Sequence, residues 1–343
     1  MESESENGNG HGTSNEADFG DATTLVIDEE THTSFRRLDQ FLSHKLEISR
    51  TFIKKLFESG EITAVASVCK LSLSKLPKVG TEIVVQIPPP VDSTALPENI
   101  PLDILYEDED IIAINKRAGM VVHPAPGHAR GTLVNALLYR CPDLQGIGGI
   151  KRPGIVHRLD IGTTGAMVVA KNARAHEEMV LLFSSHRIEK IYEAVVITTK
   201  NSGERIAGSG SFCSRIGRHP SNRLKMAVIE AKDKGKEAIT HYKVIKELCS
   251  CLYHLQLRIE TGRTHQIRVH LSSHLRTPIV MDPLYARPSD HLIKMPMDFR
   301  EILQNYEYPL LHSRSIAFIH PISGKELKIV APYPEIFNQV LSK

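Results

Sequence analysis

The segment from Gly154 to Ala170 constrains this chain more than any other part of it. The apolar residues near its two ends, Ile155-Val156 and Met167–Val169, predict two short buried strands. The turn between them carries a histidine, an arginine and a carboxylate, and its glycines and threonines suit unusual backbone angles. Asp160 in this turn can serve as a nucleophile, an acid or a base, or it can simply cap the turn.

Three motifs occur in an order that is typical of one protein family. His157-Arg158-Leu159-Asp160, with Thr163-Thr164-Gly165 behind it, resembles the catalytic loop of the RluA-type RNA pseudouridine synthases. Lys190–Ala194 resembles the tyrosine strand of that family, and Gly262–Leu271 resembles its arginine motif. The similarity runs from about Pro101 to near the C-terminus.

This resemblance implies an enzyme that isomerises specific uridines in folded RNA without a metal, nucleotide or flavin cofactor. The implied fold is α+β: a catalytic domain around a mixed, mainly antiparallel sheet, with the active site in a basic cleft. Asp160 is implied as the essential carboxylate, Tyr192 as the residue that stacks on the base and takes part in proton transfer, and Arg158 as the replacement for the flipped uridine. The sequence leaves open whether Asp160 abstracts a ribose proton or attacks covalently.

The arginine motif also has a physical interpretation. Thr264 is expected to cap a helix that runs to about His274, and Arg268 then faces inward on the same side as Leu271. A buried guanidinium needs a carboxylate partner, and Asp160 is the candidate.

Basic and polar residues near these motifs are expected to contact RNA. Residues 215–225 resemble a family segment that predicts an RNA-contacting loop, although a solvated turn has the same composition. The predicted substrate-binding residues are His157, Arg158, Arg263, His265, Gln266, Arg218, Arg223 and Lys225.

Hydrophobic periodicity predicts further elements of the catalytic domain. One departure from the family pattern is Met281, where glycine is usual. The expected strands are 104–106, 111–114, 188–197 and 253–259, and the expected helices are 133–139 and one capped by Asn172 that extends to Phe183.

Charge and composition divide the chain into a tail, a small domain, a linker and the catalytic domain. Residues 1–35 contain nine acidic and no Lys or Arg residues, which leaves 42 basic against 31 acidic residues in the remainder, a net +11. Such an excess favours a polyanionic partner. The expected boundaries are 1–33 for a disordered acidic tail, 34–90 for the small domain, 91–100 for a Pro-rich linker and 101–343 for the catalytic domain.

The small domain is predicted to contain two helices and a closing strand at 83–87, with Ser49 as the cap of the second helix. Its pattern resembles the small α/β RNA-binding domain of a bacterial small-subunit ribosomal protein, except that residues 62–67 lack the usual Asn-Gly turn. A helical adaptor with solvated lysines is the alternative. Phosphate contacts are expected from Arg37, Arg50, Lys54 and Lys55.

Several other classes of protein are disfavoured. The five cysteines form no Cys-x-x-Cys pair, so neither a disulfide framework nor a thiolate zinc site is indicated, and a cytoplasmic location is expected. His270 and His274 have zinc-pair spacing, but no third ligand is evident, so structural or solvent-facing histidines are favoured. No apolar run is long enough to cross a membrane.

The resemblance and the basic charge together predict an RNA pseudouridine synthase, and a monomer is expected although the sequence does not determine the oligomeric state. Ribosomal RNA of the large subunit is favoured as its substrate, with transfer RNA as the alternative. Two other functions stay open: a uracil-releasing glycosidase, which usually needs two carboxylates, and a catalytically silent RNA-binding protein. Rearranged uridine, free uracil or neither product would distinguish the three.

Overall fold

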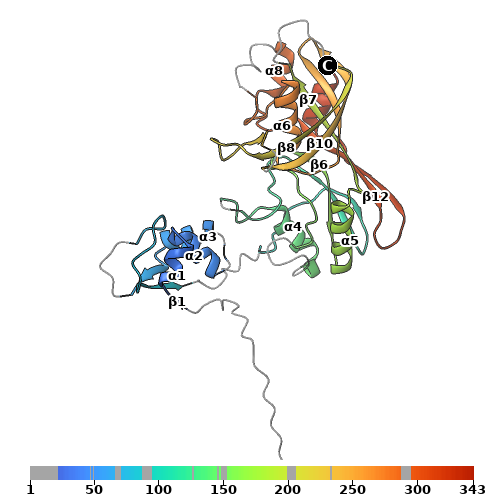
Figure 1. Cartoon of the computed structure of the whole chain (residues 1–343). Helices are drawn as coiled ribbons and strands as arrows, with labels where there is room; N and C mark the ends of the chain where they lie inside the picture. The colour runs from blue at the N-terminus through green and yellow to red at the C-terminus, as the bar shows by residue number, and fades with distance from the viewer. Residues whose placement is uncertain are drawn as a thin grey trace, which may run out of the picture. The chain divides into compact units, whose positions relative to one another are not determined.

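The chain consists of two compact units, Met1–Asp92 and Ser93–Lys343 (Figure 1). Each unit has its own core of buried apolar side chains. The computed structural model describes residues 22–46, 48, 50–65, 71–86, 95–125, 127–144, 147, 153–198, 206–231, 234–286 and 295–343, without the side chains of Thr51, Phe52 and Lys55.

The small unit combines short helices with an antiparallel sheet in the order β1-β3-β2. Leu38, Phe41 and Leu42 have helical spacing and are buried together with Ile83 and Val85 of the central strand. Helix and sheet thus share one core. The elements are β1 (Ala22–Val26), α1 (Glu29–Ser34), α2 (Leu38–Lys45), α3 (Arg50–Glu58), β2 (Ile62–Ala64) and β3 (Glu82–Gln86).

The expectation of a disordered tail up to residue 33 is wrong for residues 22–33. Strand β1 pairs with β3 along its whole length, and Asp28 caps α1 by accepting a hydrogen bond from the Thr31 N–H at 2.7 Å. Ile27 is fully buried. The short apolar run that ends at Ile27 is hidden when composition is averaged over an acid-rich segment. Residues 1–21 and the expected cap Ser49 lie outside the described residues.

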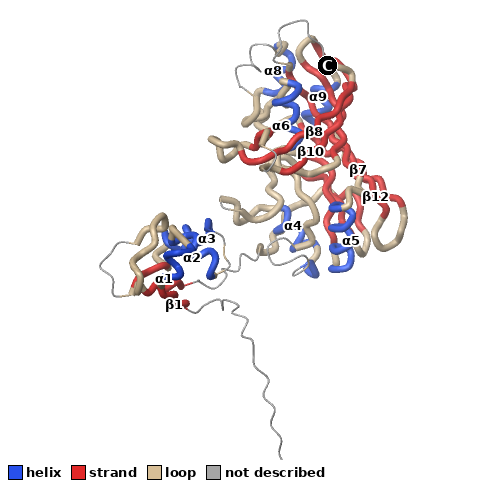
Figure 2. Tube along the Cα trace, in the orientation of Figure 1, coloured by secondary structure: helices blue, strands red, loops and turns tan. Residues whose placement is uncertain are grey.

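The large unit is an α+β fold whose helices flank a large sheet, as the red strands and blue helices of Figure 2 show. Its first elements are β4 (Ile104–Glu107), β5 (Ile111–Lys116), α4 (Leu133–Arg140), the 3-10 turn Pro142–Leu144, β6 (Thr164–Ala170), α5 (Ala173–Ser184) and β7 (Glu189–Ile197). The others are β8 (Ser209–Arg218), β9 (Met226–Val228), β10 (Lys236–Cys249), β11 (Leu252–Ile259), α6 (Gln266–His270) with the π-helical turn Leu271–Leu275, α8 (Met297–Leu303), β12 (Leu311–Ile319), β13 (Glu326–Val330) and α9 (Glu335–Leu341).

The sheet runs in the order β4-β5-β6-β12-β7-β11-β10-β8-β9, with β13 paired to β12. Among the described strands, β6 and β12 form the parallel pair, and the other pairings are antiparallel. Strands far apart in sequence therefore meet at the centre of the sheet. Ser313 of β12 lies opposite both Gly165 of β6 and Tyr192 of β7, which brings two of the three motifs together.

The strands and helices expected in the catalytic domain are confirmed, including the cap of α5, where the Asn172 side chain accepts from the Ala175 N–H at 2.8 Å. Other expectations are wrong. Ile155 forms only an isolated bridge to Val169, Val156 belongs to no strand, and residues 215–218 belong to β8 instead of a loop. His265, in a left-handed conformation (φ 56°), precedes α6 in place of a Thr264 cap.

The expected linker is also shorter than predicted at its C-terminal end. Residues 95–100 pack on α4, where the Asn135 side chain donates to the Leu96 carbonyl at 2.8 Å and the Glu98 N–H donates to the Asn135 carbonyl at 2.9 Å. Residues 91–94 lie outside the described residues. Within the described part of the chain, no helix is long and apolar enough to span a lipid bilayer.

Candidate active site

Two glycines shape the loop that carries Asp160. Gly154 has a φ of 68°, and a Cβ on it would lie 2.3 Å from the Ala170 carbonyl oxygen. Gly165 has a φ of 106°, and a Cβ there would lie 2.2 Å from the Ser313 carbonyl oxygen. Any larger residue would push the loop away from β6 or β12. These close approaches place Asp160 beside the centre of the sheet.

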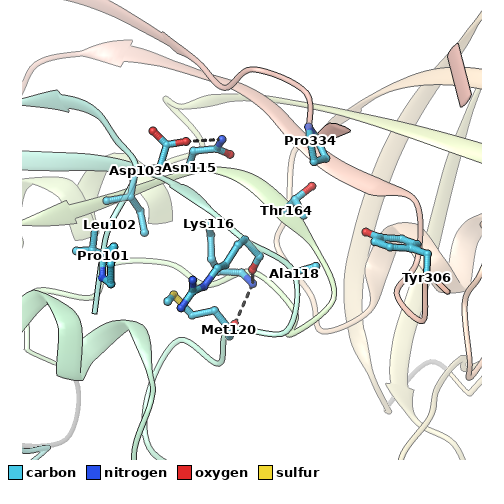
Figure 3. A pocket seen from close by; sticks show the side chains of 12 residues that line it. Pro101, Leu102, Asp103, Asn115, Lys116, Ala118, Met120, Thr164, Tyr306 and Pro334 are labelled. Atoms are coloured by element: carbon cyan, nitrogen blue, oxygen red, sulfur yellow. Dashed lines mark hydrogen bonds between the residues drawn. The ribbon is translucent and has the colours of Figure 1, made fainter. Parts of the chain in front are cut away.

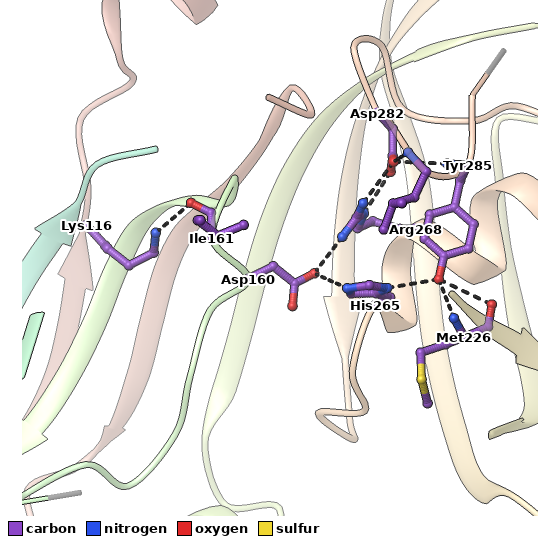
Figure 4. A network of polar contacts seen from close by, with 9 residues as sticks. Lys116, Asp160, Ile161, Met226, His265, Arg268, Asp282 and Tyr285 are labelled. Atoms are coloured by element: carbon purple, nitrogen blue, oxygen red, sulfur yellow. Dashed lines mark hydrogen bonds and ion pairs between the residues drawn. The ribbon is translucent and has the colours of Figure 1, made fainter. Parts of the chain in front are cut away.

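Arg268 lies between two carboxylates (Figure 4). Its Nε and Nη2 donate to Asp282 Oδ2 and Oδ1 at 2.7 and 2.9 Å, a bidentate pair, while Nη1 donates to Asp160 Oδ2 at 3.2 Å. The arginine is 5% exposed and Asp282 is 2% exposed. The inward direction of Arg268 and its contact with Asp160 are therefore as predicted, but Asp282 is the stronger partner and was not predicted.

His265 connects Asp160 with the β8–β9 hairpin. Its Nε2 lies 3.9 Å from Asp160 Oδ2, and its Nδ1 lies 2.9 Å from the Tyr285 hydroxyl. That hydroxyl accepts from the Met226 N–H at 2.7 Å and donates to the Met226 carbonyl at 3.2 Å (Figure 4). Burial lowers the pKa of His265, which favours the neutral imidazole.

Lys116 is a buried lysine behind the Asp160 loop. Its ammonium group donates to the carbonyls of Met120 (Figure 3), Arg117 and Ile161 (Figure 4) at 2.9, 3.0 and 3.2 Å. Lys116 also lines a hollow of about 420 Å³ together with apolar residues such as Leu102 (Figure 3). Burial therefore lowers its pKa to about 7, although the negative charge of Asp160 opposes the shift.

Tyr192 and Asp160 line one hollow, together with Arg158, Ile259 and Leu311. Tyr192 is 8% exposed, and burial raises the pKa of its hydroxyl to about 12, against the opposing effect of a hydrogen bond with Ser313. The phenol is thus neutral at physiological pH. The hollow offers one apolar wall, one carboxylate and one phenol.

Two residues expected to contact substrate, His157 and Gln266, line the hollows around Asp160 and also make structural hydrogen bonds. The His157 ring accepts a hydrogen bond from the Val168 N–H at 3.0 Å, and burial lowers its pKa to about 3. Gln266 uses its amide fully: the oxygen accepts from Arg263 N–H and the Thr261 hydroxyl, and the nitrogen donates to the Ile239 carbonyl and the Thr240 hydroxyl. Gln266 thereby fixes the turn that leads into α6.

The expected basic contacts occupy the rim of the site. Arg158 is exposed and lines the hollows on both sides of Asp160. Arg263 donates to the Glu237 carbonyl at 2.9 Å, and Lys225 lies 5.8 Å from the Tyr285 ring centroid. Arg218, at the end of β8, donates to the Arg223 carbonyl at 2.8 Å. These cations flank the approach from the β8–β9 hairpin.

In the small unit, several of the expected phosphate-binding side chains are already paired. Arg37 and Arg50 both bind Asp39, at 2.9 and 2.6 Å, and these contacts lower the pKa of Asp39 to about 2. Lys54 lies 3.5 Å from Glu58. The side chain of Lys55 is outside the described part of the structure. Arg37 and Arg50 remain 41% and 50% exposed, so they still face solvent.

One group of possible metal ligands occurs among the described residues, formed by Asp108, Asp110 and His320. The carboxylates of Asp108 and Asp110 already accept hydrogen bonds from neighbouring groups. The His320 Nδ1 accepts from the Ile322 and Ser323 N–H groups, which leaves the ring proton on Nε2, the atom that faces Asp108 at 3.2 Å. His270 bonds Ser214 at 2.9 Å. Ser214 lies in β8, so His270 has the structural contact that the sequence favoured.

Asp282, Tyr285 and Lys116 are the site residues that sequence reasoning missed. The first two lie in the segment Asp282-Pro283-Leu284-Tyr285, directly behind Met281. Met281 has a φ of 61°, so the departure from glycine occupies a left-handed position that glycine suits better. The glycine that the family usually has at position 281 was thus the signal for a tight turn, and this turn directs Asp282 toward Arg268.

Comparison with known proteins identifies relatives along nearly the whole chain. Residues 110–273 match the model of a family described as RNA pseudouridylate synthase. An uncharacterised RNA pseudouridine synthase of Synechocystis is 42% identical over 306 residues, which cover 89% of this chain and 88% of that protein. Ribosomal large subunit pseudouridine synthase D of Xylella fastidiosa is 40% identical over 313 residues, 90% of this chain and 88% of that protein.

Solved structures share the fold. Human RNA pseudouridylate synthase domain containing 1 superimposes with a TM-score of 0.52 at 24% identity, covering 69% of this chain and 85% of that one. Human RNA pseudouridylate synthase domain containing 4 gives a TM-score of 0.53, also at 24% identity, over 70% of this chain and 92% of that one. The architecture of the large unit is therefore the one expected from the motifs.

We expect Asp282→Asn to lower the free energy of unfolding by about 3 kcal/mol, because the buried Arg268 loses a charged partner while the turn keeps its hydrogen-bond acceptor. Urea unfolding measures the change. Asp298→Asn is the matched control, since Asp298 lies 4.0 Å from Lys343 with both side chains about half exposed, and it should cost less than about 1 kcal/mol. Equal losses in the two variants would contradict this role of Asp282.

Stability should depend on pH through Lys116. Its lowered pKa means that the folded protein binds fewer protons here than the unfolded chain from about pH 7 to about pH 10, so the cost of burying the charge is greatest at low pH and falls as pH rises. The free energy of unfolding of the wild type should therefore rise relative to Lys116→Met by up to about 1.4 kcal/mol per pH unit. Urea unfolding across this range tests the slope, and a constant difference would contradict it.

Proposed function

The chain belongs to the RluA-type RNA pseudouridine synthases, and we propose that its substrate is large-subunit ribosomal RNA and that Asp160 is its essential carboxylate. The observation that carries the second part is the shared guanidinium of Arg268, which orients Asp160 in a hollow that also contains Tyr192. The reaction breaks the N-glycosidic bond of a uridine, turns the uracil and rejoins it to the ribose through carbon five. Because the product is an isomer, no group is supplied or released.

The geometry of Asp160 suits direct contact with the reacting nucleotide. Oδ2 is held by Arg268 at 3.2 Å and lies 3.9 Å from His265, whereas Oδ1 has no hydrogen-bond partner among the described residues. One oxygen is thus held in place, and the other is proposed to contact the substrate. The bidentate contact of Arg268 with Asp282 keeps the guanidinium in place when Oδ1 reacts. Either a covalent attack or a proton abstraction would use the same oxygen.

Tyr192 lies in the same hollow and is proposed to stack on the target base and to take part in moving the carbon-five proton. Its ring is fixed on β7 opposite Ser313, whose hydroxyl donates to the Ala166 carbonyl at 3.0 Å. Because the pKa of the phenol is about 12, the hydroxyl starts the reaction protonated. The hydroxyl can therefore accept a proton only if it gives up its own proton at the same time. The carboxylate of Asp160 lines the same hollow.

The rim cations are proposed to hold the RNA around a flipped uridine. A glycosidic bond inside a base stack cannot be reached, so the target nucleotide must leave the helix. Arg158 is exposed at the junction of the hollows beside Asp160 and is proposed to fill the vacated position. Arg263, Lys225, Arg218 and Arg223 are proposed to contact phosphates.

The choice of ribosomal RNA is supported by relatives named as ribosomal large subunit pseudouridine synthase D, which align over about nine-tenths of the chain. An alignment of that length is too long for the large unit alone, so the likeness to these relatives includes part of the small unit. Transfer RNA is the alternative substrate, and a map of pseudouridine positions separates the two.

Replacing Asp160 in cells tests catalysis and substrate together. Asp160→Asn keeps the shape and removes the charge, so we expect pseudouridines at specific positions of large-subunit ribosomal RNA to disappear from a transcriptome-wide map. Tritium release from carbon-five-labelled uridine in that RNA should fall to background in vitro, while RNA affinity persists. Asp298→Asn should keep full activity. Sites lost only from transfer RNA would overturn the substrate, and normal tritium release would overturn the role of Asp160.

Tyr192→Phe keeps the ring and removes the hydroxyl. We expect RNA affinity to stay within about twofold, because stacking is retained, whereas tritium release should fall by at least about 100-fold, the usual contribution of a positioned proton-transfer group. Single-turnover measurements at saturating enzyme separate the two effects. Full activity would restrict Tyr192 to stacking.

The small unit is proposed to add phosphate contacts through Arg37, Arg50, Lys54 and Lys55. A chain that begins at Ser93 should bind RNA more weakly, and the dependence of log affinity on log salt should flatten by about 0.7 to 0.9 for each phosphate that is no longer neutralised. Turnover on a saturating short substrate should be kept. A chain that begins at Ala22 retains β1 and serves as the control. An unchanged salt slope would indicate an adaptor role for the small unit.

A further inference from the structure

A second hollow, which we call the flanking hollow, lies beside the one that contains Asp160. It has a volume of about 500 Å³ and is formed by the segment 156–158, the C-terminal half of α5, the start of β7 and the turn after β11. Arg158, Tyr192, Ile259 and Arg263 line both hollows. Because they share these lining residues, the two hollows are continuous. A molecule bound in the first hollow can therefore extend into the second.

One wall of the flanking hollow is an aromatic platform. The rings of His157 and Phe183 are stacked with centroids 4.5 Å apart and an interplanar angle of 24°. The hydrogen bond from the Val168 N–H holds the imidazole in place, and its low pKa keeps it uncharged. Val156 and Val180 extend the apolar surface, and Val180 is 42% exposed. A flat, uncharged ring fits such a wall.

The flanking hollow also contains positively charged side chains that have no acidic partner among the described residues. Among the described residues, Arg158, Lys190 and Arg263 lie within 4 Å of no carboxylate. Lys190 is only 6% exposed, and its ammonium donates to the Glu260 carbonyl at 3.3 Å and lies 6.0 Å from the Phe183 ring centroid.

The acidic residue of this hollow does not neutralise these cations. The Glu260 carboxylate binds His241 at 2.7 Å and Arg258 at 3.5 Å. A buried ammonium without a counter-ion is costly, and burial together with the charge of Arg263 lowers the pKa of Lys190. The hollow therefore favours an anion next to its aromatic wall.

We propose that the flanking hollow is a subsite for one nucleotide that neighbours the target uridine in the same RNA strand. Its base stacks on Phe183, and its phosphate binds Lys190, Arg158 and Arg263. This inference rests on the proposed function, because the continuity of the two hollows matters only if Asp160 receives a nucleotide. The base accounts for the aromatic wall of the hollow, and the phosphate accounts for its unpaired cations.

The test uses the full chain and a hairpin RNA with a single uridine in its loop. The fluorescent base 2-aminopurine replaces the nucleotide before or after that uridine, because its emission is quenched on stacking. We expect quenching at one of these positions with the wild type and none there with Phe183→Leu. The affinity of Phe183→Leu should fall by about 5- to 150-fold, the range for losing one base–aromatic stack. Phe212→Leu is the matched control: Phe212 stacks on Tyr242 and His274 outside this hollow, and quenching should persist.

Lys190→Gln gives an independent readout if Phe183→Leu fails to fold. The salt slope of RNA binding should drop by about one in this variant, as expected when one phosphate is no longer neutralised. An abasic nucleotide at the quenched position should weaken the wild type but not weaken Phe183→Leu further. Equal weakening of both proteins, or an unchanged salt slope, would overturn the subsite. All readouts are binding measurements, so a protein that binds in this way without forming pseudouridine would refute the function and keep the subsite.

Discussion

The catalytic region depends on one guanidinium that is shared by two carboxylates. Arg268 gives its two-pronged contact to Asp282 and a single N–H to Asp160. If the buried arginine bound Asp160 alone, some of its guanidinium N–H groups would have no acceptor. If it bound Asp282 alone, the carboxylate of Asp160 would be free to rotate. The division of contacts orients the carboxylate and leaves its Oδ1 without a hydrogen-bond partner among the described residues, as the proposed role requires. It also explains why Asp282 is almost completely buried although it is not proposed to react.

This interaction couples segments that are distant in sequence. Asp160 lies in the loop held by Gly154 and Gly165, and Arg268 belongs to α6. Asp282 begins a turn in which its carboxylate accepts the Leu284 and Tyr285 N–H groups. Tyr285 then binds both backbone groups of Met226 in β9. A displacement of the β8–β9 hairpin by RNA would therefore reach Asp160 through Tyr285 and His265. The rim that is proposed to contact phosphate and the reacting group form one connected network.

The sequence predicted those features that follow a regular period. Arg268 was placed inward by helical spacing, and most strands were found from alternation or short apolar runs, because backbone geometry imposes these periods locally. The predictions failed for polar side chains whose partners are distant in sequence. Nothing near Gln266 indicates that it forms a hydrogen bond with β10, and nothing near Lys116 indicates that it binds the Ile161 carbonyl. Asp282 was missed for the same reason, since its partner lies 14 residues earlier.

The balance of charge differs between the interior of the site and its rim, which is proposed to bind RNA. Inside, the carboxylates of Asp160 and Asp282 face Arg268, and Lys116 adds a partial charge because its pKa is about 7. Burial keeps His265 towards its neutral form, so it adds little positive charge. The two carboxylates therefore outweigh the positive charge of Arg268 and the partial charge of Lys116, and this group of residues is slightly negative before substrate arrives. At the rim, Arg158 and Arg263 are paired with no carboxylate in the described part of the chain, so the attraction for phosphate is strongest there. A slightly negative interior repels phosphate but not an uncharged uracil, so the base can enter while the charged backbone of its strand is favoured at the rim.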